Sequence, residues 1–576
     1  MASRLTTLIV VSIVAATLIA GIIARAQRDD DGPVDVIVFN GKVYAGDGPG
    51  RFAEAVAVRG NTIFRVGSNR EIKRMRRAQT TVIDAHGGAV VPGFNDAHLH
   101  FASGSLSLSQ VNLLDATTRE QVSDTVRDWA EAHADQRWVL GRGWYYTAFP
   151  DGLPTRQLLD AIVPNRPAYL IAYDGHSGWA NTAALKLAGI TRATTNPKNG
   201  IVVKDTKGEP TGILKESAMA LMREVLPKPD RAQRLMAIRA GIHEAHRLGV
   251  TSVQNANGSP EDVELWDELR RDGDLKVRVY HALSAGPGFT QADADRFEET
   301  RREHLDDPLL KAGAVKLMVD GVIETHTAAM LEPYSNRPTK GMPNFTREEL
   351  NRLVALLDRR GWQVWIHAIG DGGVRMALDA FEAAAKANPE PARGRRHRIE
   401  HIETIDPADV PRFRALGVIA SMQPLHANPD PGFGGVWTEN IGPARASRAW
   451  LWHSIAKAGG RLAFGSDWPV VTLDPRMGIH VALNRMSPKG EPEGGSQPEE
   501  RLPLTAVIDA FSSGAAYASF DEQRKGKLAK GMLADIVIFS TDIFSVAPEQ
   551  VLDALVDVTI FDGKVVYNRA DATTEP

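Results

Sequence analysis

Short apolar runs, each about as long as a β-strand, recur between residues 90 and 466 and alternate with longer amphipathic stretches. The longer stretches, such as 231–248, 347–360 and 373–387, repeat apolar residues at helical spacing. Alternating strands and helices are typical of a parallel sheet, and so many repeats predict an α/β chain folded as a (β/α)8 TIM barrel. The candidate strands, one more than a barrel needs, are 90–95, 168–173, 250–255, 276–282, 313–319, 362–367, 397–402, 417–422 and 461–466.

The two ends of the chain show a different pattern, in which strand-like runs are separated by short turns. These runs are 35–44, 55–58 and 62–67 at one end, and 534–539 and 558–567 at the other. The sequence Asn40-Gly41-Lys42-Val43-Tyr44 is nearly repeated by Asp562-Gly563-Lys564-Val565-Val566-Tyr567. We therefore predict a small composite β-sandwich domain formed by 33–89 and 520–570, with the barrel spanning 90–519.

Residues 1–26 have the pattern of a signal peptide. Arg4 precedes the apolar segment 8–23, and the small residues Ala24 and Ala26 follow it. The apolar segment is slightly short for a helix that spans a bilayer. We expect export to the bacterial periplasm. The alternative is an uncleaved N-terminal anchor that holds the protein at the membrane, facing the periplasm.

The amino-acid composition limits the partners and the metal ligands that the protein can use. The formal net charge is −4 and long basic runs are absent, so we expect no nucleic-acid partner. We separately expect a small-molecule substrate. The sequence leaves open whether the protein forms a homodimer. The chain contains no cysteine, which excludes disulfides and thiolate ligands. Any metal ion must therefore be held by nitrogen and oxygen atoms.

Polar residues with metal-binding side chains stand where the predicted strands end, and in a barrel the chemistry gathers at that face. His98 and His100 follow the first strand, and in an extended segment side chains two apart point to the same side. Further along, the strand ends or interiors carry Lys316, His367, His401 and Asp467. A lysine within a buried strand needs a partner or a modification, because an unpaired buried ammonium is costly.

This ordered set resembles the amidohydrolase superfamily, and within it the YtcJ-like branch (amidohydrolase family 3), which is related to N-substituted formamide deformylases. The resemblance covers essentially the whole chain after the signal segment. The motifs that carry it are Gly175-His176-Ser177-Gly178-Trp179-Ala180-Asn181, Lys316-Leu317-Met318-Val319-Asp320-Gly321, Ile366-His367-Ala368-Ile369-Gly370-Asp371, Arg398-Ile399-Glu400-His401, Gly465-Ser466-Asp467-Trp468-Pro469 and Gly526-Lys527-Leu528-Ala529-Lys530-Gly531-Met532-Leu533-Ala534-Asp535.

The resemblance implies a metal-dependent hydrolase of carbon–nitrogen bonds, with one or two divalent ions, Zn²⁺ being expected. It implies that the metal ligands are His98, His100, Lys316, His367, His401 and Asp467. Lys316 would be carboxylated and would bridge two metal ions, and Asp467 would also be the general base. Because Lys316 would end the fourth strand, the 168–173 strand falls into an insertion of about 105–245.

Several residues keep two interpretations. His176 could contact the substrate or the transition-state oxyanion, or could be a structural loop residue. Asp320 either lines the pocket or caps the next turn, and we favour the cap. Glu216 is expected to be an ordinary helix-surface carboxylate rather than a site residue. His326 and His426 lie near candidate loops on the active face, and each could be a metal ligand or a substrate contact. The aromatic residues of the insertion, expected mainly in its core, are Trp144, Tyr145, Tyr146 and Trp179.

Two other functions compete with amide hydrolysis. The same metal site would also open cyclic amides, esters or lactones, because only the lining of the pocket would differ. An exported binding protein that had lost catalysis would lack part of the ligand set, and all six positions are filled here. A third variant is a single-metal enzyme in which Lys316 stays unmodified.

Overall fold

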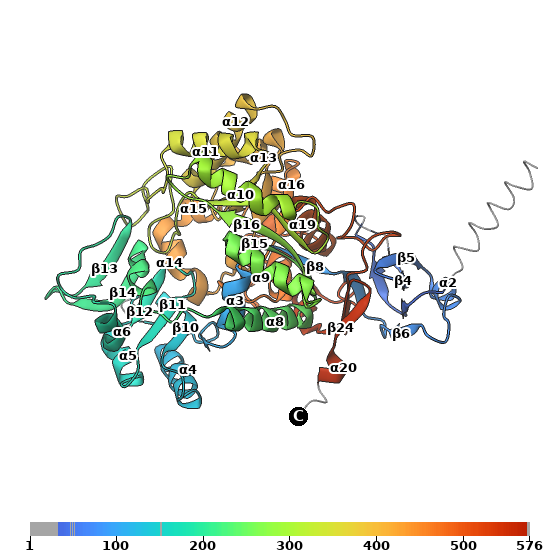
Figure 1. The fold of residues 1–576 in the computed structure, drawn as a ribbon, viewed down its shortest axis with the longest axis horizontal. Coiled ribbons are helices and arrows are strands. Elements are labelled where there is room, and N and C mark those ends of the chain that lie inside the picture. The colour runs from blue at the N-terminus through green and yellow to red at the C-terminus, as the bar shows by residue number, and fades with distance from the viewer. Residues whose placement is uncertain (1–32, 47, 49, 51, 150–151, 573–576) are drawn as a thin grey trace, which may run out of the picture.

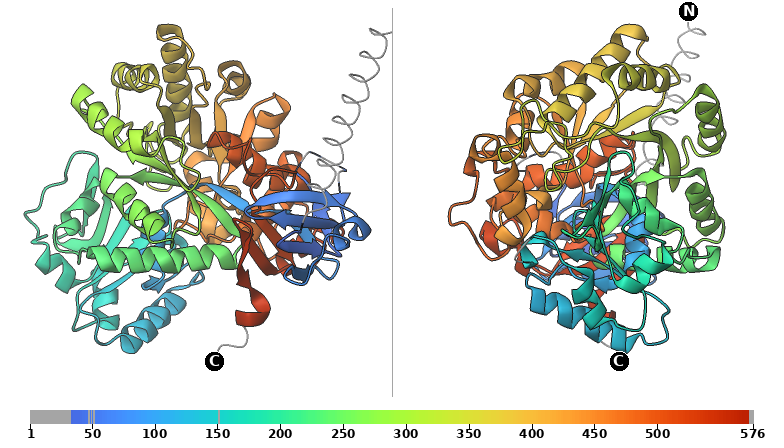
Figure 2. Two further views of the ribbon diagram at one scale, coloured as in Figure 1. Left: turned by 45° about the vertical axis from the view of Figure 1, so that its right-hand side comes forward. Right: turned by 90° about the vertical axis from the view of Figure 1, so that its left-hand side faces the viewer.

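The computed structural model describes residues 33–46, 48, 50, 52–149 and 152–572. The predicted signal peptide, 1–26, lies outside the described residues. Figure 1 shows a central barrel, a sandwich of strands from both chain ends on one side, and an insertion on the other. The second set of views places the insertion and the sandwich at opposite ends of the barrel (Figure 2). Among the described residues, no helix is long and apolar enough to cross a membrane.

Eight parallel strands form the barrel, which confirms the predicted TIM-barrel fold. In chain order they are β8 (Phe94–Leu99), β15 (Val250–Gly258), β16 (Arg278–Ser284), β17 (Leu310–Met318), β18 (Gln363–Ala368), β19 (Arg398–His401), β20 (Ile419–Met422) and β21 (Arg461–Phe464). The circle closes just beyond β21, where the Asp467 amide donates to the His98 carbonyl at 2.7 Å and the His100 amide donates to the Trp468 carbonyl at 2.7 Å. This closure brings the first and last predicted ligands to one seam.

Helices pack around the strands, and α8 (Arg231–Arg247), α9 (Pro260–Arg271), α10 (Gln291–Glu303) and α11 (Arg347–Arg359) each begin at a capping box. In α11 the Thr346 hydroxyl accepts the Glu349 amide, and the Glu349 carboxylate accepts the Thr346 amide. Leu350 and Leu353 then face the barrel core. The other helices around the barrel are α3 (Phe101–Ser107), α12 (Asp371–Ala387), α13 (Val410–Leu416), α14 (Pro431–Ile441), α15 (Pro443–Ala446), α16 (Trp452–Lys457), α17 (Pro475–Asn484), α18 (Leu504–Asp509) and α19 (Ala515–Ala518).

Both chain ends contribute to the small domain, and its two sheets pack face to face. The first sheet has the order β5 (Thr62–Gly67), β4 (Ala55–Arg59), β1 (Val36–Phe39) and β6 (Thr81–Asp84). The second has the order β24 (Lys564–Asn568), β23 (Val556–Phe561), β22 (Ile536–Phe539), β7 (Ala89–Pro92), β2 (Lys42–Tyr44) and β3 (Phe52–Ala53). Val38, Val56, Ile538 and Ile560 meet between the sheets. The predicted composite β-sandwich is thus part of the observed fold. The short helices α2 (Asn69–Lys73) and α20 (Arg569–Ala572) also belong to these end segments.

The insertion folds around a sheet of its own. Its strand order is β13 (Gly200–Lys204), β14 (Pro210–Glu216), β12 (Ser177–Ala180), β11 (Ala168–Ala172), β10 (Val139–Trp144) and β9 (Val111–Asn112). Its helices are α4 (Arg119–Ala132), α5 (Arg156–Ile162), α6 (Thr182–Leu187) and α7 (Ala220–Arg223). Trp144, Tyr145, Tyr146 and Trp179 are buried together in this unit. The predicted range of 105–245 also took in most of α8, whose Leu235 and Ile238 instead pack into the core of the barrel.

The predicted strand 90–95 is two strands in two different sheets. β7 pairs with β2 and β22 of the small domain, whereas β8 pairs with β15 in the barrel. Gly93 stands between them, and a Cβ at this position would overlap the Thr251 hydroxyl and lie 2.8 Å from Thr251 Cγ2. The chain can change sheets here because glycine allows this close approach.

Candidate functional site

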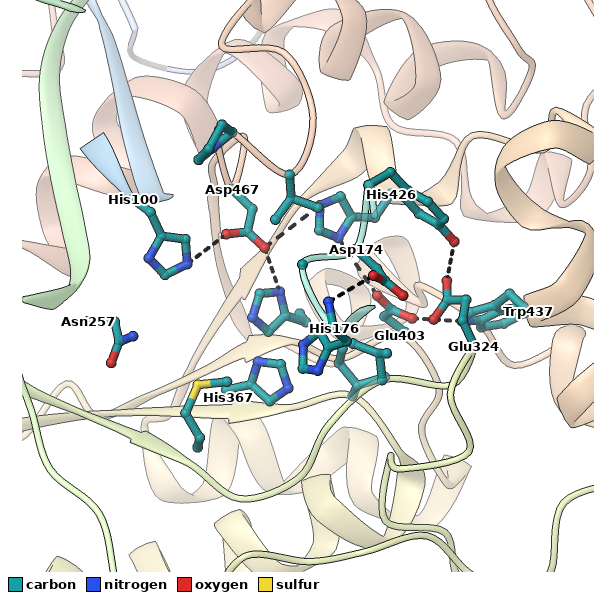
Figure 3. Close-up of a pocket in the computed structure, with 18 of the residues that line it drawn as sticks. His100, Asp174, His176, Asn257, Glu324, His367, Glu403, His426, Trp437 and Asp467 are labelled. Carbon is teal, nitrogen blue, oxygen red and sulfur yellow. Dashed lines mark hydrogen bonds and ion pairs between the residues drawn. The ribbon is translucent and has the colours of Figure 1, made fainter. Parts of the chain in front are cut away.

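A cavity of about 230 Å³ opens at the carboxyl ends of the barrel strands. The barrel contributes His100, Lys316, His367, His401 and Asp467 to its wall. Insertion residues and residues of the loops after the strands complete the lining, including Arg142, Tyr173, Asp174, His176, Glu324, Glu403, His426, Trp437 and Trp450. Figure 3 shows His100 and His426 on either side of Asp467, with His176 and His367 below them. The cavity therefore lies between the barrel and the insertion.

Three side chains converge at the base of this cavity with the spacing of a metal site. One ligand atom each from His98, His401 and Asp467 lies within 4.8 Å of the other two. The Asp467 carboxylate is 3.5 Å from His98 Nε2 and 3.7 Å from His401 Nδ1. His401 and Asp467 have φ angles of 75° and 61°. Backbone of this kind is costly for residues other than glycine and tends to occur at functional sites.

The remaining predicted ligands surround this group without joining it. His100 Nε2 lies 3.2 Å from Asp467 Oδ1, and Lys316 Nζ lies 3.4 Å from His98 Nε2. The ring of His367 is 4.5 Å from that of His401, measured between ring centres. The structure thus brings all six predicted ligand residues to the same end of the barrel, and among their histidine and aspartate side chains the group within 4.8 Å is His98, His401 and Asp467.

His98 is held by a buried chain of charged groups. Its Nδ1 lies 2.6 Å from Glu400 Oε2, and the other oxygen of Glu400 accepts Arg398 Nε at 2.6 Å. Arg398 also donates to the Ala97 carbonyl and stacks on the ring of Trp365. Although burial by itself raises the pKa of Glu400, the positive charge of Arg398 and the contact with His98 lower it to about 2. Carboxylates commonly orient metal-binding histidines in this way, and here Nε2 of His98 points toward Asp467.

The protonation states of the cluster suit metal binding. Burial lowers the pKa of His98 to about 4 and the pKa of His367 and His401 well below the ordinary value, so these imidazoles are neutral. Burial alone would raise the pKa of Asp467, but the hydrogen bond from His100 and the nearby imidazoles hold it well below the ordinary value. Neutral imidazole and ionised carboxylate are the forms that bind a divalent ion.

The ligand atoms of His98, His401 and Asp467 are suited to one divalent ion. His401 Nδ1 is buried, makes no hydrogen bond with any described residue and lies 3.7 Å from the Asp467 carboxylate. Buried polar atoms normally have a partner, and a divalent ion held between His401 Nδ1 and the Asp467 carboxylate would be that partner. The site offers imidazole nitrogen and carboxylate oxygen only, which are ligands typical of zinc.

Burial lowers the pKa of Lys316 to about 8, against the opposing effect of Glu400 and Asp467. Its side chain is almost fully buried in β17 and lines the cavity. Desolvation therefore increases the fraction of neutral amine at this position. A neutral amine is the form that could react to become a carbamate.

His176 enters the cavity from the insertion, and Glu216 supports it. His176 Nδ1 lies 2.8 Å from Glu216 Oε2, and the other oxygen of Glu216 accepts the hydroxyls of Thr325 and Thr327 at 2.7 and 2.9 Å. Burial alone would lower the pKa of His176, but the ion pair with Glu216 raises it to about 9. The expectation that Glu216 is a helix-surface carboxylate is wrong: it ends strand β14 and is largely buried.

The structure also distinguishes between the two interpretations of Asp320, His326 and His426. Asp320 is buried behind the cavity and accepts the backbone amides of Ala329 and Gly370, so it ties two loops together rather than lining the pocket. His326 bonds to Asn336 and is not part of the cavity wall. His426 does line the cavity, 3.9 Å from Asp467.

The motifs of the sequence indicate no role for several charged residues of the site. Glu324, Glu403 and Arg142 line the cavity, and Glu400 orients His98. The alternation of Arg398 and Glu400 within a buried strand was the one available signal, because polar side chains two apart share a face. The loop residues carried no such pattern.

A family model described as "Amidohydrolase family", of the family 3 type, matches residues 81–567. The chain therefore belongs to the amidohydrolase family. The Arabidopsis thaliana protein LONG AFTER FAR-RED 3 is 32% identical over 544 residues, which cover 92% of this chain and 91% of that protein.

Two bacterial relatives match over a similar length. The putative amidohydrolase YtcJ of Bacillus subtilis (strain 168) is 30% identical, covering 93% of this chain and 99% of the relative. The N-substituted formamide deformylase of Arthrobacter pascens is 26% identical, covering 93% and 98%.

Among solved structures, an uncharacterized metal-dependent hydrolase from Pyrococcus furiosus is 26% identical with a TM-score of 0.69, covering 88% of this chain and all of that one. Family and fold together define this chain as a metal-dependent hydrolase of the amidohydrolase superfamily.

Proposed function

We propose that this protein hydrolyses carbon–nitrogen bonds of non-peptide amides, including N-acyl and N-formyl compounds, with one or two divalent metal ions, Zn²⁺ in the first instance. The observation that carries the proposal is the convergence of His98, His401 and Asp467 within 4.8 Å at the base of a cavity. The similarity to an N-substituted formamide deformylase supports the choice of substrate class.

His98 and His401 would hold the metal together with Asp467, and His100, His367 and Lys316 would complete the set. A divalent ion bound there would polarise the scissile carbonyl and make water more acidic. If Lys316 is carboxylated, its carbamate would supply a further anionic oxygen ligand in place of a costly buried ammonium. The neutral amine that this modification requires is favoured by the lowered pKa of Lys316.

Asp467 is the proton carrier of the proposed reaction. It would accept the proton of the attacking water and pass it to the leaving nitrogen, so that a formamide and water give formate and an amine. His176, held by Glu216 on its Nδ1 side, would present Nε2 to the carbonyl oxygen of the substrate. A donor aimed at the developing oxyanion stabilises the transition state.

A screen on metal-loaded protein tests this function. The protein is stripped with a chelator, its metal content is measured, and it is reloaded separately with Zn²⁺, Mn²⁺ or Co²⁺. N-butylformamide, N-benzylformamide and N-benzylacetamide are then assayed for release of acid and amine, beside a cyclic imide and a lactone. Hydrolysis of the open-chain amides that disappears on stripping and returns on reloading is the expected result. Protein that takes up no metal, or activity that survives stripping, would overturn the proposal, and preference for the cyclic compounds would favour the alternative reaction.

We also propose that residues 1–26 direct export and are then removed. The basic start, the apolar segment 8–23 and the small residues before Gln27 support this. Expression of the full chain in a bacterial host, followed by fractionation and mass measurement, tests it. A periplasmic protein that begins at Gln27 is expected. An intact N-terminus in the membrane fraction would instead show the anchor, and cytoplasmic protein would contradict export.

A further inference from the structure

One end of the cavity carries two carboxyl groups that have no lysine or arginine partner among the described residues. Glu324 follows strand β17 and Glu403 follows β19, and both line the cavity. Among the described residues, no lysine or arginine nitrogen is paired with either carboxylate within 4.0 Å, and His426 Nδ1 lies 3.7 Å from Glu403. Each carboxylate is held instead by a neutral donor, Tyr173 for Glu324 at 2.7 Å and Trp437 for Glu403 at 2.7 Å.

The surroundings of Glu324 disfavour its ionised form unless a cation is bound nearby. Burial raises the pKa of Glu324 to about 8, and the negative charges of Glu403 and Asp174 add to that rise. Asp174 is better compensated, because the His176 backbone amide and the Tyr146 hydroxyl donate to it and His176 is a nearby cation. Carboxylates brought together in a poorly solvated space repel each other, and a cation placed between them relieves that repulsion.

The walls of the same space are aromatic. Trp437 and Trp450 stack with ring centres 4.6 Å apart, and Tyr173 lies on the insertion side. Aromatic faces attract organic cations, most strongly where water is excluded. Figure 3 shows Glu324, Glu403 and Trp437 gathered on the side of the cavity away from His100.

A further observation, independent of the carboxylates, indicates a ligand here. The His426 side chain is 9% exposed, lines the cavity, and its Nε2 makes no hydrogen bond with any described residue. That ring lies between Glu403 at 3.7 Å and Asp467 at 3.9 Å. The His426 ring therefore lies between the carboxyl end of the cavity and Asp467. Its Nε2 is available to hydrogen-bond a substrate that extends from one to the other.

We propose that Glu324 and Glu403, with the Trp437–Trp450 pair, bind a positively charged ammonium group of the substrate. This inference rests on the proposed amide hydrolysis and deepens it: the preferred substrates are N-acyl or N-formyl derivatives of short diamines, with a free ammonium a few carbon atoms from the scissile bond. The short spacing follows from the single imidazole ring that separates Glu403 from Asp467. Arg142, which also lines the cavity, donates to the Tyr173 carbonyl at 3.2 Å.

Two formamides of nearly equal shape test the preference. N-formyl-1,3-diaminopropane carries an ammonium where N-butylformamide carries a methyl group. The metal-loaded protein should show a kcat/KM at least about tenfold higher for the ammonium compound, since a charge-assisted contact is lost in the other. Glu324→Gln and Glu403→Gln should each reduce that ratio about tenfold, whereas Glu332→Gln, an exposed glutamate in the same loop region, should leave it unchanged. Equal rates for the two formamides, or a preference that survives both substitutions, would overturn the proposal.

Binding measured without turnover keeps this inference separate from the proposed function. Calorimetric titration of the full chain with n-butylammonium should give a saturable heat that Glu324→Gln and Glu403→Gln weaken. The neutral 1-butanol and the anionic butyrate should bind more weakly than n-butylammonium. If neither formamide is hydrolysed while n-butylammonium binds as described, amide hydrolysis fails and the cation site stands. If the amides are hydrolysed and n-butylammonium binds no better than 1-butanol, the cation site is refuted.

Discussion

The pair of His176 and Glu216 joins the insertion to the loop after β17, which carries Thr325 and Thr327. Because Glu216 accepts on the Nδ1 side, the ring is fixed with Nε2 toward the cavity. Glu216 is not positioned to touch the substrate itself, so it is a positioning residue. Its loss should leave His176 present but misdirected and less often protonated.

Replacing Glu216 by Gln is therefore expected to lower kcat about tenfold or more, with a smaller change in KM, because an oxyanion donor acts mainly in the transition state. The pKa of His176 is raised to about 9 by Glu216, so its protonated form persists at mildly alkaline pH in the native protein. Without Glu216 the pKa falls, and the alkaline limb of the kcat/KM profile should move to lower pH. A profile that keeps its alkaline limb in Glu216→Gln would contradict this role, and Glu332→Gln serves as the exposed control.

Asp467 combines two duties, as a metal ligand and as the proton carrier. Asp467→Asn keeps the size and one oxygen of the side chain but cannot accept the proton of water. We expect kcat to fall by about 10²–10⁴-fold, the usual contribution of a general base. Metal content, measured by mass spectrometry of the purified protein, should stay within about twofold of the parent. Full activity in a metal-loaded Asp467→Asn protein would remove Asp467 from the proton path.

At the scale of single residues, the sequence predicted best those site residues that lie near the end of a barrel strand. His98, His367, His401 and Asp467 each follow or end a buried strand, so their meeting could be expected from the barrel alone. The partner of His176 could not, because Glu216 lies 40 residues away and is brought beside it by the antiparallel pairing of β12 with β14. Glu324 and Glu403 lie in loops, where no periodicity indicates direction.

At the scale of elements, the passage from β7 to β8 links the two largest units of the chain. β7 belongs to the small domain and β8 to the barrel, with Gly93 between them. Periodicity alone could not separate these strands, because both are buried on both faces and read as one apolar run. The boundary depends on close packing against Thr251 and Asp535, which a local pattern does not record.

Gly93→Ala tests that packing. The new Cβ would overlap the Thr251 hydroxyl and lie 3.1 Å from Asp535 Cβ, so the free energy of unfolding should fall by about 1–3 kcal/mol. Gly286→Ala is the matched control, because its Cβ would meet nothing within 4 Å, and it should change stability by less than about 0.5 kcal/mol. Urea unfolding followed by circular dichroism measures both. Partial recovery in the double variant Gly93→Ala, Thr251→Ala would assign the loss to this contact; no loss in Gly93→Ala would exclude it.

At the scale of the whole molecule, a buried ion pair connects the barrel with the small domain. Arg278, at the start of β16, donates to both oxygens of Asp535 at 2.8 and 3.0 Å and to Asp562 at 2.8 Å. Arg278 and Asp535 are almost fully buried. The domain formed by the two chain ends is therefore attached to the barrel by an ion pair as well as by apolar contacts. The ligand-bearing strand β8 begins next to Asp535 of that ion pair.

Removing one member of this pair should destabilise the whole chain. Asp535→Ala leaves the Arg278 guanidinium buried without its main partner, which typically costs about 3–5 kcal/mol. Because the pair is buried, added salt should change this loss little. Unfolding in urea, followed by tryptophan fluorescence and by circular dichroism, should shift to lower denaturant by both signals together if the domains unfold as one unit. Asp553→Ala, an exposed aspartate in the same C-terminal segment, should leave the transition in place. Two separated transitions in Asp535→Ala would show that the ion pair sets the cooperativity between the domains, whereas an unchanged transition would show that apolar packing alone holds them together.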